Sequence, residues 1–218
     1  MLDFSLVKEY IPFLLKASVL TVEISILSII LGLFLGIVIV VMKLSKFKPI
    51  SLFASFYIWS LRGTPLLVQL FLVYFGLPQI GIELQPFTAS VLALGINAGA
   101  YIAEILRGGI LSIPKGQMEA AQSLGLSYPT IMRRIIFPQA LRVSIPAIGN
   151  ESITLLKDSS LASLVTVSEL MMTSQRFAAT NYAFIEFYIT AALLYLIMTT
   201  ILSFFLRKVE FKLSISEH

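Results

Sequence analysis

Polar and ionisable side chains recur in two apolar stretches of this chain, at spacings that place them on one face of each helix. The residues are Asn97, Tyr101, Glu104, Glu151, Thr154, Lys157 and Asp158. An ionisable group near the bilayer centre costs roughly 2.5–3.5 kcal/mol, so each needs a reason. Two polar faces on different helices predict a lined cavity, and we expect these residues to bind substrate there.

A free amino acid is a solute that such a set can bind. Its ammonium group needs carboxylates or carbonyls, and its carboxylate needs a cation or helix N-terminal amides. Acids outnumber bases here, which favours a cationic side chain such as arginine, lysine or histidine. Two alternatives stay open: Lys157 and Asp158 can neutralise each other, and Glu104 can pair with Arg107 at i+3.

The composition requires a membrane. The chain is 57% hydrophobic and 13% charged, too apolar for a soluble domain of 218 residues. The apolar stretches are Ile24–Met42, Gly63–Ile82, Leu84–Ala103, Phe187–Leu206 and a region between Arg142 and Met172 that charges interrupt. We expect the first helix to begin near Ile11, the second near Ile50, and the interrupted region to contain an irregular section. The sequence therefore predicts a single all-α domain, residues 1–218, with about five spans.

Small residues and proline add detail to this bundle. Gly32 and Gly36 form a Gly-x-x-x-Gly pattern, which predicts a close-packing face on the first helix. Pro65 removes a backbone donor and predicts a kink in the second span. Arg62 can snorkel to the membrane surface there or bond the freed carbonyls.

Basic residues orient the bundle. They cluster in the first loop, the third loop and the C-terminal segment, whereas the second loop, residues 79–86, has no Lys or Arg. The basic residues are Lys43, Lys46, Lys48, Lys115, Arg133, Arg134, Arg207, Lys208 and Lys212. The positive-inside rule then predicts an outside N-terminus, a cytoplasmic C-terminus and a cytoplasmic third loop.

The third loop, residues 112–138, has the layout of an elbow. A turn near Gly116 precedes a short helix over 117–124, Gly125 fits the residue after its C-cap, and Ser127 with Pro129 begins the next helix. Two short helices that meet at a fixed angle can transmit a rigid-body push. Glu119 has two open roles: a capping-box acid that folds back on the turn, or a partner for a basic residue of another subunit.

This loop resembles the EAA loop of ABC-importer membrane subunits. The residues that match that pattern are Glu119, Ala120, Ala121, Gly125, Ile135 and Pro138, and Phe137 replaces its usual leucine. Three further stretches, 62–69, 100–109 and 155–161, together with Ile113–Gln117, extend the resemblance to the histidine/arginine/glutamine permease group. The chain is thus similar to permease subunits of polar amino-acid ABC importers with the type I fold.

The resemblance implies an assembly in a bacterial-type cytoplasmic membrane. It implies two permease subunits, with a homodimer as our expectation, two P-loop ATPase subunits and an extracytoplasmic binding protein. ATP and Mg would be used by the ATPase, whose movement reaches the bundle through Gln117, Glu119, Ala120, Ala121 and Gly125 and drives alternating access. Shared motifs do not name the amino acid, so glutamine or another polar amino acid stays an alternative to basic ones.

Other functions are disfavoured by what the sequence lacks. It has no P-loop motif, so we expect no ATP hydrolysis and no cofactor in this chain. With no cysteine and one histidine, we expect neither a catalytic site nor a metal site, and the net charge of +4 suits cytoplasmic loops rather than nucleic-acid binding. An ion-coupled secondary transporter is a weaker alternative, because such folds usually have more spans and inverted repeats.

Overall fold

The computed structural model describes residues 4–214, which form helices joined by short connections, with no strand among them. The elements are α1 (Ser5–Lys43), α2 (Lys48–Gly63), α3 (Leu66–Phe71), the π-helical η1 (Leu72–Gly76), the 3-10 helix η2 (Leu77–Ile80), α4 (Pro86–Ser112), α5 (Lys115–Ser123), α6 (Tyr128–Ile131), the π-helical η3 (Met132–Ile136), α7 (Phe137–Asp158), the 3-10 helix η4 (Ser159–Val165), α8 (Leu170–Asn181) and α9 (Phe184–Ser214). The all-α fold class predicted from the sequence is confirmed.

By length and apolarity, fewer helices qualify as membrane spans than the five that the sequence predicts. Within the described residues, α1, α4 and α9 meet that criterion, and α2 with the helical segment that follows it makes a fourth if the bent pair is one span. The remaining predicted span is α7, whose 22 residues cover about 33 Å but include several charges. The first helix also begins earlier than expected, at Ser5 rather than near Ile11.

Close packing of α1 on α4 forms the core of the bundle. A Cβ built on Gly36 would lie 2.6 Å from Ile102 Cγ2, and one built on Gly32 would lie 2.9 Å from Ala98 Cβ. The approach is mutual, because a Cβ on Gly95 of α4 would lie 2.7 Å from Leu31 Cδ2. The predicted close-packing face on the first helix is therefore confirmed, and its partner is α4 of the same chain.

The second predicted span is broken rather than kinked. The chain bends by 106° between α2 and the segment Leu66–Ile80. At the break, Thr64 and Pro65 have extended backbone, with ψ of 146° and 136°. A residue before proline avoids the helical region, so Thr64 ends α2 outright and the predicted kink understates the change of direction.

The interrupted membrane region follows the prediction of a helix, an irregular section and a second helix. α7 gives way to the 3-10 helix η4, which ends at Thr166 with a left-handed φ of 69°. Glu169 then caps α8: its carboxylate accepts bonds from the amides of Met171 (2.9 Å) and Met172 (2.8 Å). Tyr195 of α9 donates to the same carboxylate at 2.9 Å, so this fully buried residue joins α8 to α9.

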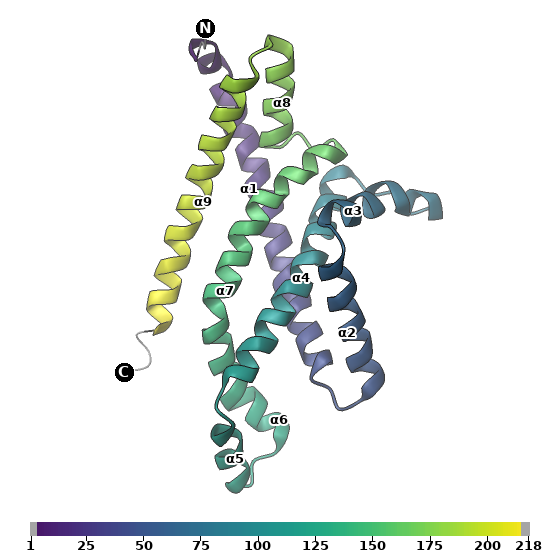
Figure 1. Cartoon of the computed structure of the whole chain (residues 1–218), viewed down its shortest axis with the longest axis vertical. Helices are drawn as coiled ribbons and strands as arrows, with labels where there is room; N and C mark the ends of the chain where they lie inside the picture. Colours follow the sequence, from purple (N-terminus) through teal and green to yellow (C-terminus); the bar gives the residue numbers. More distant parts are fainter. Residues whose placement is uncertain (1–3, 215–218) are drawn as a thin grey trace.

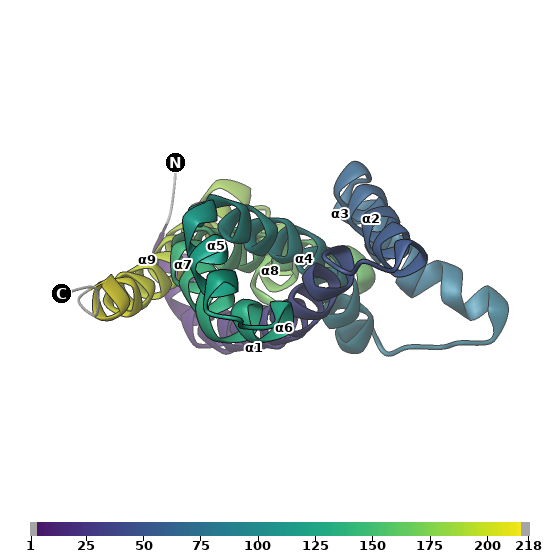
Figure 2. The ribbon, with the colours of Figure 1, turned by 90° about the horizontal axis from the view of Figure 1, so that it is seen from below.

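The elements with basic loops gather at one end of the molecule. In Figure 1, the α1–α2 connection, α5 and α6 lie at the lower end, and α8 and the N-terminus lie at the upper end. Figure 2, seen from below, shows α9 on one side of the bundle and the α2–α3 arm on the other. The first and third loops touch, because Lys46 Nζ lies 5.7 Å from the centre of the Tyr128 ring. The basic first and third loops therefore lie at the same end of the bundle.

Candidate functional site

The third loop, residues 112–138, contains the elbow that the sequence predicts, and it is called the coupling loop below after the role that the sequence predicts for it. α5 ends in a Schellman motif, in which the Gly125 amide donates to Gln122 O at 2.9 Å and the Leu126 amide donates to Ala121 O at 3.2 Å. Gly125 has a left-handed φ of 74°, which glycine adopts without strain. The assignment of Gly125 as the residue after the C-cap is confirmed.

The second arm of the elbow also begins where the sequence predicts. Ser127 is the N-cap residue of α6 and Pro129 lies in its first turn. The Ser127 hydroxyl bonds the hydroxyl of Thr130 at 2.9 Å rather than a backbone amide. Ala121 of α5 is buried at 3% exposure and packs in a cluster with Ile131 and Ile136. The buried face fixes the angle between the two arms.

Most other positions of α5 are exposed to solvent. Gln117, Glu119 and Ala120 are exposed. α5 begins at Lys115, so Glu119 is too far along the helix for a capping box, and α5 has no side-chain N-cap bond. This result removes the capping alternative for Glu119.

Leu124, at the tip of the elbow, is a candidate contact residue that the motif comparison missed. Its side chain is 80% exposed beside the turn at Gly125. A large apolar side chain in a polar loop is the signal that identifies it from sequence.

The α2–α3 break is stabilised by polar side chains from α3 and α4. Gln69 Nε2 donates to Leu61 O at 2.8 Å and to Thr64 O at 3.1 Å, carbonyls that the break leaves without helical partners. Asn97 Nδ2 donates to Gln69 Oε1 at 3.0 Å and to Leu61 O at 3.3 Å. Gln69 and Asn97, rather than Arg62, therefore bond the freed carbonyls. Sequence reasoning missed Gln69, although a glutamine in an apolar run is a recognisable signal.

Arg62, near the end of α2, lies against α4. Its guanidinium lies 5.2 Å from the centre of the Tyr101 ring, a cation–π contact. It also acts electrostatically on Glu104 of α4 and on Glu151 of α7. The structure therefore places the exposed Arg62 guanidinium against Tyr101, while Glu104 and Glu151 are close enough to feel its charge.

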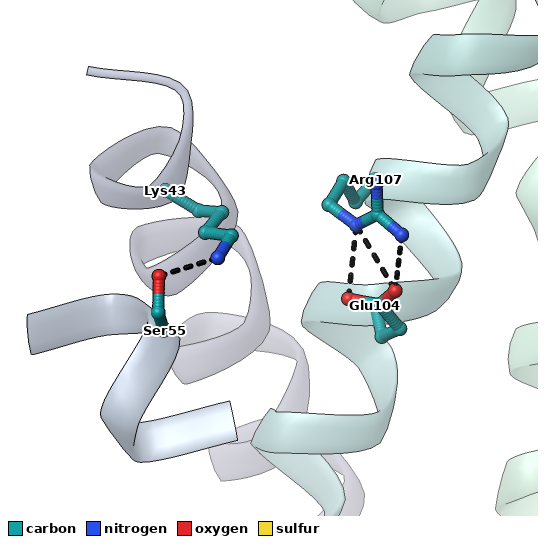
Figure 3. A network of polar contacts seen from close by, with 4 residues as sticks. All are labelled: Lys43, Ser55, Glu104 and Arg107. Atoms are coloured by element: carbon teal, nitrogen blue, oxygen red, sulfur yellow. Dashed lines mark hydrogen bonds and ion pairs between the residues drawn. The ribbon is translucent and has the colours of Figure 1, made fainter. Parts of the chain in front are cut away.

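Glu104 is already paired within its own helix. Arg107 Nε donates to both carboxylate oxygens of Glu104, each at 3.0 Å, and Arg107 Nη2 completes a bidentate ion pair (Figure 3). Lys43, at the end of α1, bonds Ser55 of α2 nearby and also acts electrostatically on Glu104. The alternative in which Glu104 pairs with Arg107 is thus the observed one.

The α7 residues of the predicted site divide between two directions. Glu151 and Asp158 are half-buried, they interact electrostatically, and neither forms an ion pair in the described part of the chain. Thr154 and Lys157 are exposed. Lys157 lines a groove with Thr199 and other residues of α9, away from the face that Glu151 and Asp158 share. Close neutralisation of Asp158 by Lys157 is not observed.

No group of three or more acidic, histidine or cysteine residues that can hold a metal occurs within residues 4–214. We name the set formed by Arg62, Tyr101, Glu104, Glu151 and Asp158 the membrane polar cluster. It offers one cation on α2 and two carboxylates on α7, none of which forms an ion pair within the described residues.

Comparison with known proteins identifies the family to which the chain belongs. A model of the family described as binding-protein-dependent transport system inner membrane component matches residues 10–215. The arginine transport system permease protein ArtQ of Bacillus subtilis (strain 168) is 43% identical over 213 residues, which cover 97% of each chain. The glutamine transport system permease protein GlnP of Escherichia coli (strain K12) is 39% identical over 215 residues, which cover 98% of each chain.

Solved structures agree with these relatives. A crystal structure of an amino acid ABC transporter with histidines superposes with a TM-score of 0.92 at 41% identity, covering 97% of this chain and 99% of that chain. An inward-facing structure of the MetNI methionine ABC transporter, 19% identical with a TM-score of 0.70, shares the fold. The chain belongs to the family of binding-protein-dependent transport system inner membrane components, as the multi-pass permease subunit of an amino-acid ABC importer whose ATPase is a separate subunit.

Proposed function

We propose that this subunit forms the path by which a basic amino acid, such as arginine, lysine or histidine, enters the cell. The observation that carries the proposal is the membrane polar cluster. Arg62 is the cation for the substrate carboxylate, and Glu151 with Asp158 receives the ammonium group and the cationic side chain. The arginine permease relative supports this substrate class.

The roles of the other predicted residues follow from their contacts. The ring of Tyr101 positions the Arg62 guanidinium, and Glu104 contributes negative charge to the site while it stays paired with Arg107. Asn97 is a positioning residue, because its amide holds the α2–α3 break through Gln69. Thr154 and Lys157 are exposed on α7 and reach substrate in another conformational state of the transport cycle.

Coupling to ATP in this proposal runs through α5. The exposed residues Gln117, Glu119, Ala120 and Leu124 contact the ATPase, while buried Ala121 transmits the push to the bundle. Two ATPase subunits, a homodimer of this chain and an external binding protein complete the assembly. The N-terminus then lies outside and the coupling loop inside, as the basic loops indicate.

Uptake by the purified assembly in proteoliposomes tests the proposal. We expect ATP inside the vesicles to drive arginine uptake, and excess lysine or histidine to compete. Glu151→Gln removes one carboxylate, whose charge-assisted bond contributes about 1.5–3 kcal/mol, so uptake should fall roughly tenfold or more. Glu83→Gln, in the exposed second loop, is the matched control and should leave uptake unchanged.

A second candidate substrate is glutamine, favoured by the similarity to the glutamine permease. If glutamine alone competed for transport, the substrate would be glutamine and not a basic amino acid. Uptake that an ion gradient drives without ATP would instead overturn the ABC mechanism.

A further inference from the structure

An apolar groove lies beside the coupling loop and has no part in the proposed transport path. Its volume is about 560 Å³, within the range of ligand sites. One wall is the C-terminal part of α1, including Val40 and Val41, and the other is the α6–η3 segment, including Met132. Ile110 of α4 lines it as well. We call it the α1–α6 groove.

The groove is bordered by positive charge. Lys46 and Arg133 line it, and no acidic residue does. Both side chains are exposed, and neither forms an ion pair within the described residues. Lys46 lies over the ring of Tyr128, which also lines the groove. An occupant must therefore combine an apolar body with an anionic end.

We propose that the α1–α6 groove binds an anionic phospholipid of the cytoplasmic leaflet, such as phosphatidylglycerol. The acyl chains lie against Val41 and Met132, and the phosphate lies between Lys46 and Arg133. Basic pockets between helices on the cytoplasmic side recognise such headgroups, and each cation near the surface contributes to the attraction. The proposal rests on the proposed orientation, which places this end of the bundle in the cytoplasm.

Because of where the groove lies, a bound lipid affects the movement of the coupling loop. Its second wall, α6 and η3, directly follows the coupling helix α5. A bound lipid holds this segment against α1, in the arrangement that the structure describes. Movement of the coupling loop relative to α1 changes the shape of the site, so lipid affinity and the transport cycle are linked.

Lipid binding to the purified, delipidated full chain tests this proposal without ATPase or uptake. Native mass spectrometry during titration with phosphatidylglycerol or phosphatidylethanolamine measures the retained adducts. The variants are Lys46→Ala/Arg133→Ala, which removes both cations, and Val41→Trp, which fills the apolar part. Lys208→Ala is the matched control, because Lys208 also lies over an aromatic ring, that of Phe204, outside the groove. Size-exclusion profiles confirm that each variant is folded.

We expect one phosphatidylglycerol to be retained in preference to phosphatidylethanolamine. Loss of both cations should lower its affinity about 30-fold. Val41→Trp should weaken both lipids, and Lys208→Ala should change neither. Equal retention of the two lipids, or unchanged affinity in the double variant, overturns the proposal. So does an equal loss in Lys208→Ala, which indicates general surface attraction, or displacement by inorganic phosphate, which indicates a simple anion site.

Discussion

Alanine at position 125 perturbs the elbow of the coupling loop at one point. Gly125 has a φ of 74°, and a Cβ built there meets nothing within 4 Å. Gly116, near the start of α5, also has open space around a built Cβ but no positive φ. The pair Gly125→Ala and Gly116→Ala therefore differs in backbone conformation and not in packing.

The magnitude follows from that difference. A non-glycine residue in the left-handed region costs about 1 kcal/mol, or a factor of about five in the population of the formed elbow. Alanine within a helix is instead better than glycine by roughly 0.8–1.0 kcal/mol. Gly125→Ala should thus lose about 1 kcal/mol in the free energy of forming the Schellman motif, whereas Gly116→Ala, in the first turn of α5, should lose none.

Hydrogen exchange of the coupling loop measures this free energy. The Leu126 amide, which donates to Ala121 O, should exchange about five times faster in Gly125→Ala and no faster in Gly116→Ala. ATP-driven uptake should fall in the first variant and persist in the second, with equal membrane insertion. If both variants exchange and transport alike, the elbow geometry plays no part in coupling and the reasoning is refuted.

Three further predictions concern other parts of the molecule. Glu119→Lys reverses the charge on the exposed face of α5, so ATP-driven uptake should be lost while the chain still inserts; unchanged uptake would argue against ATPase contact at this face. Gly36→Val forces a side chain into Ile102 and should lower the free energy of unfolding by about 1–3 kcal/mol, measured by thermal unfolding. Gly108→Val is the control and should not lower it, because a Cβ built at Gly108 meets nothing within 4 Å. Equal effects would mean that the α1–α4 contact does not limit stability. Gln69→Leu leaves the carbonyls of Leu61 and Thr64 with fewer donors and should lower the free energy of unfolding by about 1–3 kcal/mol, measured in the same way. An unchanged unfolding midpoint would show that other groups stabilise the break.

Local signals made the coupling loop readable from sequence. The glycine after α5 and the serine and proline that begin α6 act within a few residues, so their positions predict the elbow directly. The glycines of α1 predict its close-packing face equally well, because close helix packing depends on side-chain size. Neither inference required knowledge of distant contacts.

Features that depend on tertiary contacts were not readable in the same way. Pro65 predicts a change of direction, but neither the 106° bend nor the bonds that Gln69 and Asn97 make to the freed carbonyls follows from local sequence. Helical spacing predicts that Glu151 and Asp158 share a face of α7, whereas Lys157 lines the α9 groove, because one residue along a helix turns the side chain by about 100°. The role of each cluster residue in substrate binding stays a prediction.

Cross-linking from the elbow tests the central claim most directly. The chain has no cysteine, so Leu124→Cys introduces one reactive site at the 80% exposed tip of the coupling loop. Tyr182→Cys is the control, because Tyr182 is 87% exposed and is the C-cap residue of α8, a helix at the opposite end of the molecule from α5 (Figure 1). We predict that a short thiol cross-linker in native membranes joins position 124, and not position 182, to a P-loop ATPase. Absence of that adduct at position 124, or equal adducts at both positions, would contradict ATP coupling through α5.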